Sequence, residues 1–236
     1  MRHNTIGEEF CLTLFGGSHQ RFIGGVIEGC PKGIKVEKSF IANELERRAA
    51  KAKYETTRKE KDEVIFLQGL ENDITIGTNI SFVIEIKAVN KYSYNDFQGL
   101  FRPSLCHYTY FFKYKEDSLN FKDMASARNT AIIVVAGSIA KMYLKKLAIE
   151  INAEVETIGG YSYKDNKKEV EELLNNVSQE GDSVGGKIKC IVKNMQKGIG
   201  EPIFDKLSAC LAKNIFSLPS VCSFELGDGI ERTKRM

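Results

Sequence analysis

A histidine in a glycine-rich turn is the first residue whose setting suits proton chemistry. His19 lies in "LTLFGGSHQRFIGG", residues 12–25, and is one of three histidines in the 236 residues. Its small neighbours leave room for a ligand, and an imidazole can donate a proton near neutral pH. A turn histidine can equally be a solvated surface residue. The turn alone therefore leaves both interpretations open.

Basic residues form a second candidate group. The stretch "NELERRAAKAKYETTRKEK", residues 43–61, contains Arg47 and Arg48 near the end of a predicted helix, followed by five more lysines and arginines. A helix dipole favours cations at this end, so a solvated basic face is one interpretation. The alternative is a clamp for phosphate or carboxylate, since arginine offers paired donors to such groups.

Two more stretches combine polar and aromatic residues. In "LFRPSLCHYTYFFKY", residues 100–114, the aromatic side chains fit a core-facing amphipathic segment as well as a binding segment. In "SARNT", residues 126–130, Ser126 suits the start of a helix, where free N–H groups bind anions. Ordinary capping explains Ser126 equally well. The sequence has no Walker loop, nucleophile elbow or zinc motif, so we expect no metal.

The composition limits the class of protein. Hydrophobic residues make up 42% of the chain, enough for a core, and the net charge of +3 is too small for a nucleic-acid footprint. The six cysteines show no CxxC pair, and the sequence begins without a signal-peptide pattern, so we expect reduced thiols and a cytoplasmic protein. Lysines interrupt the most apolar stretch, residues 131–149, before it reaches the roughly 20 residues that a bilayer requires. We expect a core helix there and no membrane contact.

Apolar periodicity predicts a mixed α+β domain with long buried helices against sheets. The expected strands cover residues 10–15, 22–28, 63–67, 80–86, 151–158, 187–192 and 221–226. The expected helices cover residues 37–48, 126–147, 167–177 and 201–216, the last with Pro202 in its first turn. No stretch has the composition of an interdomain linker, so we expect one domain over residues 1–236.

Several stretches, taken together and in order, resemble the chorismate synthase family, the last enzyme of the shikimate pathway. The similar stretches are "NTIG", "TLFGGSH", "GCPKGI", "ELERR", "TTRKEKDEV", "LFRP" with "YTY", "SARNTA" with "AGSIAK", "GDSVGG", "GIGEPIFDKL" and "ELGDGI". Their common order along the whole chain makes the resemblance specific. It implies a β-α-β sandwich with long helices between antiparallel sheets, lacking the family's C-terminal part.

The resemblance also implies an activity. The family converts 5-enolpyruvylshikimate 3-phosphate to chorismate by 1,4-elimination of phosphate, requires reduced FMN and usually forms a homotetramer; NADPH is a possible reductant. The site must then be cationic, because substrate and flavin are both anionic. By resemblance, His19 is the acid that protonates the departing phosphate, Arg48 and Arg47 bind substrate or NADP, and Ser126, Ala125 and Arg128 lie at the flavin.

The sequence departs from the family pattern at several of these positions. Gly17 and Gln20 replace a glutamate and a glycine beside the first histidine, and Leu105 occupies the place of the second. His107 lies two residues further on, and we do not expect it to reach the flavin. The segment "FKDMAS", residues 121–126, replaces a glycine-rich flavin loop, which predicts weaker FMN binding.

These departures support an alternative function. The chain ends at "GDGIERTKRM", where family members continue, so we expect an incomplete domain with exposed apolar surface or unpaired strand edges. The alternative is a catalytically inactive, truncated homologue that has a binding or assembly role or is a gene remnant. A basic RNA- or partner-binding module is a third hypothesis, disfavoured by the near-neutral charge and the lack of RNP or KH motifs.

Overall fold

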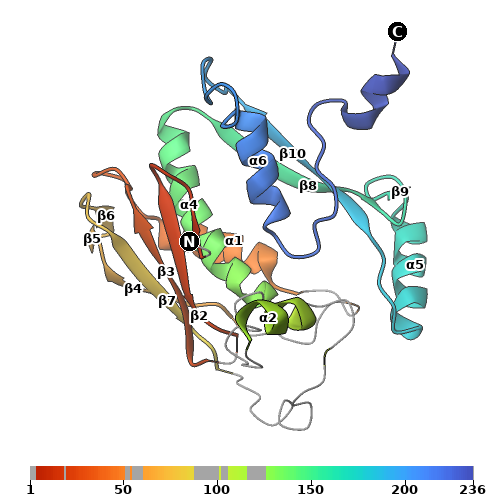
Figure 1. Ribbon diagram of the computed structural model, residues 1–236, viewed down its shortest axis with the longest axis horizontal. Coiled ribbons are helices and arrows are strands. Elements are labelled where there is room, and N and C mark those ends of the chain that lie inside the picture. Colours follow the sequence, from red (N-terminus) through yellow and green to blue (C-terminus); the bar gives the residue numbers. More distant parts are fainter. Residues whose placement is uncertain are drawn as a thin grey trace.

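The described residues form a five-stranded and a three-stranded antiparallel sheet with helices between them, and a small two-stranded ribbon (Figure 1). The computed structural model describes residues 4–18, 20–50, 54, 61–87, 101, 106–115 and 126–235, with His107 described by its backbone only. The predicted sandwich with helices between antiparallel sheets is confirmed.

The first sheet has five strands in the order β1-β2-β3-β7-β4, each antiparallel to its neighbours. Its strands are β1 (Thr5–Ile6), β2 (Cys11–Gly16), β3 (Phe22–Glu28), β4 (Val64–Gln68) and β7 (Ile80–Glu85). The side chains of β7 alternate between the two faces, so Ile80, Phe82 and Ile84 are fully buried. A small ribbon of β5 (Leu70–Glu71) and β6 (Ile74–Thr75) follows β4.

The second sheet has three strands in the order β10-β8-β9. Its strands are β8 (Glu150–Ile158), β9 (Tyr161–Ser162) and β10 (Gly186–Lys193), and helix α5 (Lys167–Gln179) lies between β9 and β10 in sequence. The register pairs Ile188 with Val155 and Val192 with Ile151. Residues directly opposite each other share a face, so these apolar side chains line one face of the sheet.

Helices α1 (Lys38–Arg48) and α4 (Thr130–Lys146) pack against each other, and α4 contacts β2 and β3 on one side and β8 on the other (Figure 1). Ile41 and Leu45 are buried on α1, and Ile132, Val135 and Ile139 are among the buried residues of α4. The prediction that this apolar helix is buried on most sides is therefore confirmed.

Gly25 on β3 permits the close packing of α4 against the first sheet. A Cβ atom at this position would lie 2.7 Å from Cγ2 of Ile132 and 3.0 Å from Cζ of Phe82. Real Cβ atoms essentially never lie closer than 3.0 Å to another heavy atom, so the Ile132 side chain would have to move. A larger side chain here therefore strains the contact between β3 and α4.

One predicted strand is wrong, and one predicted helix is confirmed but begins later than expected. Residues 221–226 form no strand, although Val221 and Leu226 suited one. Helix α6 (Leu207–Phe216) begins after the predicted start, so Pro202 precedes the helix. The reason is local, because the N–H of Glu201 donates forward to the carbonyl of Asp205 at 3.0 Å, which is a loop hydrogen bond and not a helical one.

Aromatic residues of helix α2 (His107–Tyr114) contact one another. The rings of Tyr108 and Phe112 lie 4.7 Å apart, and Tyr108 also contacts Phe101 at 5.5 Å. Tyr108 and Phe112 are exposed, so the interpretation that places these aromatics in the core does not hold for them. The pKa of the Tyr110 hydroxyl is raised, first by burial and then by the charges of Cys106 and Tyr114.

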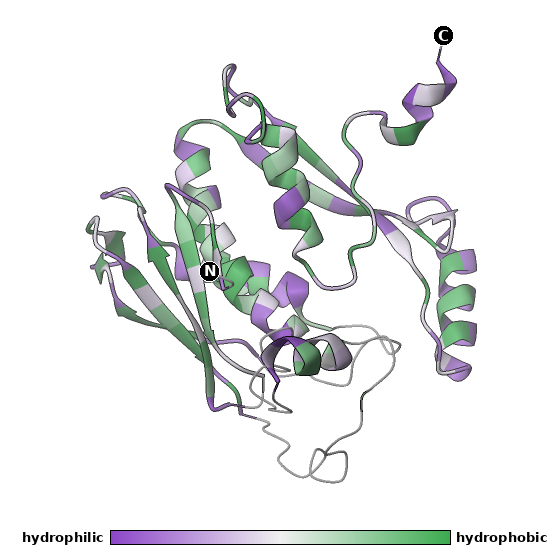
Figure 2. Ribbon diagram, viewed as in Figure 1, coloured by the Kyte–Doolittle hydropathy of each residue, from purple (hydrophilic) through white to green (hydrophobic). Residues whose placement is uncertain are grey.

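The C-terminal part of the chain has little burial. From residue 171 to residue 235 no residue is buried, and Ile188, Ile203, Phe204, Leu226 and Ile230 are all exposed. Figure 2 shows apolar residues gathered on α6, which has no buried residue. The expected exposed apolar surface is present in this region. The final helical turn is η3 (Gly229–Lys234).

Candidate active site

Arg48, at the end of α1, joins three segments of the chain. Its Nε donates to Oγ1 of Thr130 at 2.8 Å, and its NH2 donates to the carbonyl of Ala127 at 3.0 Å. Its NH1 lies 3.3 Å from Oδ2 of Asp62, which precedes β4. The guanidinium of Arg48 therefore binds both the start of α4 and Asp62.

Asp62 also pairs with Arg128. The second carboxylate oxygen of Asp62 forms an ion pair with NH1 of Arg128. The side chains of Asp62 and Arg128 are 4% and 5% exposed, whereas Arg48 retains 24%. Removing one partner of a buried pair typically costs about 3–5 kcal/mol, because the other charge remains buried. Two guanidinium groups on one carboxylate give this cluster a net charge of +1.

The predicted N-cap at Ser126 is confirmed. Its hydroxyl accepts a hydrogen bond from the N–H of Arg128 at 3.2 Å, at the start of the single-turn helix η2 (Ala127–Asn129). Oγ1 of Thr130 donates to the carbonyl of Ala127 at 2.6 Å, and α4 follows directly. The structure thus brings three predicted residues, Arg48, Ser126 and Arg128, to the beginning of α4.

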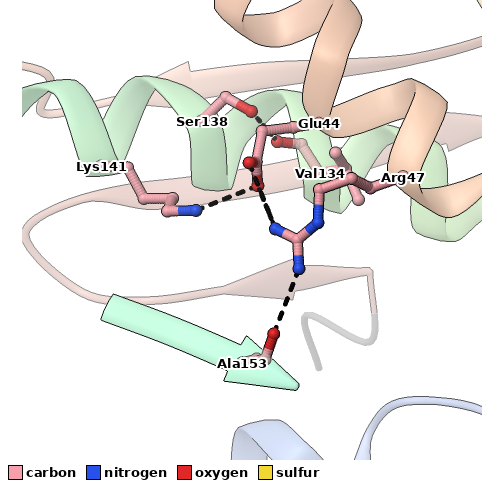
Figure 3. A network of polar contacts seen from close by, with 6 residues as sticks. All are labelled: Glu44, Arg47, Val134, Ser138, Lys141 and Ala153. Carbon is pink, nitrogen blue, oxygen red and sulfur yellow. Dashed lines mark hydrogen bonds and ion pairs between the residues drawn. The ribbon is translucent and has the colours of Figure 1, made fainter. Parts of the chain in front are cut away.

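Arg47 points elsewhere. Its NH1 lies 3.2 Å from Oε1 of Glu44, and its NH2 donates to the carbonyl of Ala153 on β8 at 3.3 Å (Figure 3). Nζ of Lys141 on α4 also binds Glu44, at 3.0 Å. Arg47 therefore ties α1 to the second sheet, whereas Arg48 ties α1 to the beginning of α4.

The pKa of Glu44 reflects this network. Burial acts first and raises the pKa, but the hydrogen bond and charge of Lys141, followed by those of Arg47, outweigh it and hold the pKa below its usual value. Glu44 is therefore ionised at neutral pH and binds both cations.

Two predicted site residues, His19 and Ala125, lie outside the described residues. Among the described neighbours of His19, β2 ends at Gly16, β3 begins at Phe22, and the N–H of Gln20 donates to the carbonyl of Gly17 at 2.9 Å. The predicted turn between two strands is thus confirmed, and the role of His19 stays a prediction.

Asp62 is the site residue that the sequence did not reveal. It lies within "TTRKEKDEV", residues 56–64, between a basic run and a strand, and no pattern connected it to Arg48 or Arg128. The pair of carboxylates at Asp62 and Glu63, between a run of cations and the strand that begins at Val64, is the signal that could have drawn attention to it. Thr130 was also missed, since it reads as an ordinary helix residue.

The donors of this cluster suit an anionic group. Its net positive charge is the feature that attracts phosphate, because the Thr130 hydroxyl already donates to the carbonyl of Ala127 and the Ser126 hydroxyl already accepts the N–H of Arg128. The partly exposed Arg48 is the cation that a ligand can reach. Two hollows of about 270 and 320 Å³, at β4 and β5 and between β8 and β10, lie away from this cluster.

The described parts of the chain contain no group of three or more His, Cys, Asp and Glu residues that could hold a metal ion. They also contain no helix with the length and apolarity required to cross a membrane.

The fold and the cluster define an α+β protein with a cationic site at the start of its central helix, and comparison with known proteins identifies its relatives. The family model for chorismate synthase matches residues 10–236. The chain belongs to the chorismate synthase family. This membership favours the family's function over an inactive remnant.

Curated relatives match almost the whole chain. The chorismate synthase of Christiangramia forsetii is 39% identical to this chain over an alignment of 256 positions, which covers 99% of this chain and 72% of that protein. The chorismate synthase of Parabacteroides distasonis is 39% identical over an alignment of 248 positions, which covers 96% of this chain and 69% of that protein. A crystal structure of chorismate synthase shares the fold with a TM-score of 0.77 at 23% identity, covering 95% of this chain and 70% of that one.

Proposed function

We propose that this chain catalyses the reaction of its family, the 1,4-elimination of phosphate from 5-enolpyruvylshikimate 3-phosphate to give chorismate and inorganic phosphate. The family match over residues 10–236 carries the proposal. The cationic cluster of Arg48, Asp62 and Arg128 supports it, because the substrate bears a phosphate and two carboxylates.

The family uses reduced FMN, and we propose that this chain binds it near the beginning of α4, through Ser126, Ala125 and Arg128. Reduced FMN, when bound, supplies the electron-rich flavin that the elimination requires. The donor set fits its phosphorylated, anionic character, and the buried Arg128 contributes charge while it holds Asp62. Because residues 121–125 depart from the family's glycine-rich loop, we expect weaker binding than in the family.

Arg48 and His19 have separate roles in this proposal. Arg48 binds an anionic group of the substrate or of NADP, and its partly exposed guanidinium is oriented by Thr130 and Ala127. Of the two neighbouring arginines we favour Arg48, since Arg47 points its guanidinium at Glu44 and β8. His19 donates a proton to the phosphate as it departs.

The test is an anaerobic assay of the purified chain with reduced FMN and 5-enolpyruvylshikimate 3-phosphate, following chorismate and phosphate. We expect turnover, a loss of about 10² to 10⁴ in rate for His19→Ala, and little change for His107→Ala. Chorismate formation should also rescue aromatic auxotrophy in a strain lacking the enzyme. Absence of turnover with saturating flavin and substrate would contradict the proposal and favour the inactive homologue.

The assembly and location follow from the same proposal. We expect a homo-oligomer, a tetramer as in the family, acting in the cytoplasm on a small anionic substrate. Light scattering of the purified chain measures its mass in solution, and a monomer at micromolar concentration would contradict this part.

A further inference from the structure

Asp62 lies between two arginines that come from distant parts of the chain. One carboxylate oxygen is 3.3 Å from NH1 of Arg48, and the other pairs with NH1 of Arg128. Asp62 thereby connects the end of α1, the approach to β4 and the start of α4. No other described ion pair is as deeply buried on both sides.

The charges of this cluster explain why a carboxylate is required. Two guanidinium groups held close together in a poorly solvated place repel each other strongly unless an anion lies between them. Asp62 supplies that anion and neutralises one of the two cations. Of the three charged side chains, that of Arg48 is the most exposed, so the net positive charge of the cluster faces solvent there.

The contacts of Arg48 fix its direction. With NH1 at Asp62, its Nε reaches Thr130 and its NH2 reaches the carbonyl of Ala127, so the guanidinium plane is set from three sides. Without Asp62, repulsion by the buried Arg128 would displace Arg48, which is the more exposed of the two arginines. A guanidinium binds phosphate well only when its fork is held in the right orientation.

We propose that Asp62 is a positioning residue, which holds Arg48 in the orientation that binds the phosphate or a carboxylate of the substrate. Asp62 does not touch the ligand and acts through Arg48. The inference rests on the proposed function for the identity of the ligand, whereas the orientation of Arg48 by Asp62 is a property of the protein alone.

Glu44 offers a matched control. It too is a carboxylate between two cations at the packed helices α1 and α4, with Lys141 at 3.0 Å and Arg47 at 3.2 Å. It lies on the side that faces β8, where Arg47 binds the carbonyl of Ala153 (Figure 3). Glu44→Gln therefore removes a similar ion-pair network without disturbing Arg48.

The experiment compares Asp62→Asn with Glu44→Gln in the full chain. Calorimetric titration with 5-enolpyruvylshikimate 3-phosphate gives the dissociation constant, and the NMR signal of the Arg48 Nε–H reports the orientation of the guanidinium without ligand. We expect Asp62→Asn to weaken substrate binding more than tenfold. We also expect the NMR signal of the Arg48 Nε–H to be lost through exchange with water. Glu44→Gln should change binding less than twofold and retain the signal.

Each outcome decides a separate claim. Equal substrate binding in Asp62→Asn and the wild type would overturn the inference. If the wild type binds no substrate, the proposed function fails, and the Arg48 signal alone decides whether Asp62 orients Arg48. A signal retained in Asp62→Asn would then overturn the positioning role.

A second variant covers the case in which Asp62→Asn does not fold. The double variant Asp62→Leu with Arg128→Met replaces the buried pair by apolar side chains, an exchange that proteins often tolerate. We expect it to fold and to bind 5-enolpyruvylshikimate 3-phosphate more than tenfold more weakly than the wild type, because NH1 of Arg48 then lacks the carboxylate that orients it, although Thr130 and Ala127 still accept from Nε and NH2. Substrate binding equal to that of the wild type in this variant would overturn the inference.

Discussion

The two sheets of this protein differ in how far their apolar residues are covered. In the first sheet, the alternating residues Ile80, Phe82 and Ile84 of β7 are completely buried in the same core cluster as residues of α4. In the second sheet, β10 has a comparable alternation of Ile188, Cys190 and Val192, yet every residue of β10 is exposed. An apolar pattern thus indicates which face of a strand can be buried. Whether that face is buried depends on the elements that pack against it.

The largest expected difference is between two phenylalanines. Phe82 is fully buried against Phe66 and α4, whereas Phe204 is 84% exposed. We expect Phe82→Ala to lower the free energy of unfolding by about 3–5 kcal/mol and Phe204→Ala by less than about 0.5 kcal/mol. Urea unfolding followed by circular dichroism measures both. Similar losses for the two variants would show that Phe204 is covered in solution.

Two glycines give the next comparison. A Cβ at Gly25 would meet Ile132, Leu12 and Phe82, but one at Gly185, just before β10, would meet nothing within 4 Å. We expect Gly25→Ala to cost about 1–3 kcal/mol by overpacking, and Gly185→Ala to leave stability unchanged or slightly raised. Thermal unfolding of both variants checks this. A neutral Gly25→Ala would mean that α4 can shift without loss.

Two carboxylates extend the comparison to charge. Glu44 is mostly buried and binds Lys141 and Arg47, whereas Glu156 on β8 lies 3.8 Å from Lys189 with both side chains about half exposed. At neutral pH we expect Glu44→Gln to cost about 1.5 kcal/mol and Glu156→Gln less than about 0.5 kcal/mol.

The pH dependence gives this prediction a second readout. Because the pKa of Glu44 is lower in the folded state, its stabilising effect is complete above the unfolded pKa of about 4.3 and disappears as the pH falls through the folded value. The difference in unfolding free energy between the wild type and Glu44→Gln should therefore shrink below about pH 4.5. A difference that is constant down to pH 3 would contradict the lowered pKa.

The sequence predicted most of the fold because strong periodicity reflects burial. The strand over residues 22–28 was placed without error, and the helix predicted from residue 126 corresponds to η2, which Ser126 caps, followed by α4 from Thr130. The two-residue strands β1, β5, β6 and β9 were missed, since a pattern needs more residues to be recognised. The strand expected over residues 221–226 has no partner strand, and an apolar stretch alone does not create one.

The candidate site was predicted in part for a related reason. Arg48, Ser126 and Arg128 were found because a resemblance and a helix start marked them. Asp62 was not found because its contacts are tertiary, fourteen residues from Arg48 along the chain and further still from Arg128. The pairing of a carboxylate with two arginines depends on how α1 packs against α4, which a sequence pattern does not encode.

The smallest expected effect concerns the apolar face of the second sheet. Ile188 is 74% exposed and lies opposite Val155, so Ile188→Ser removes little buried surface. We expect the free energy of unfolding to change by less than about 0.5 kcal/mol, with Ile84→Ser, on the buried face of β7, as the matched variant that loses several-fold more. Urea unfolding at several protein concentrations is the measurement. A loss above about 1.5 kcal/mol for Ile188→Ser that grows with concentration would show that this face is covered in solution, because a side chain stabilises only through the surface that it removes from water.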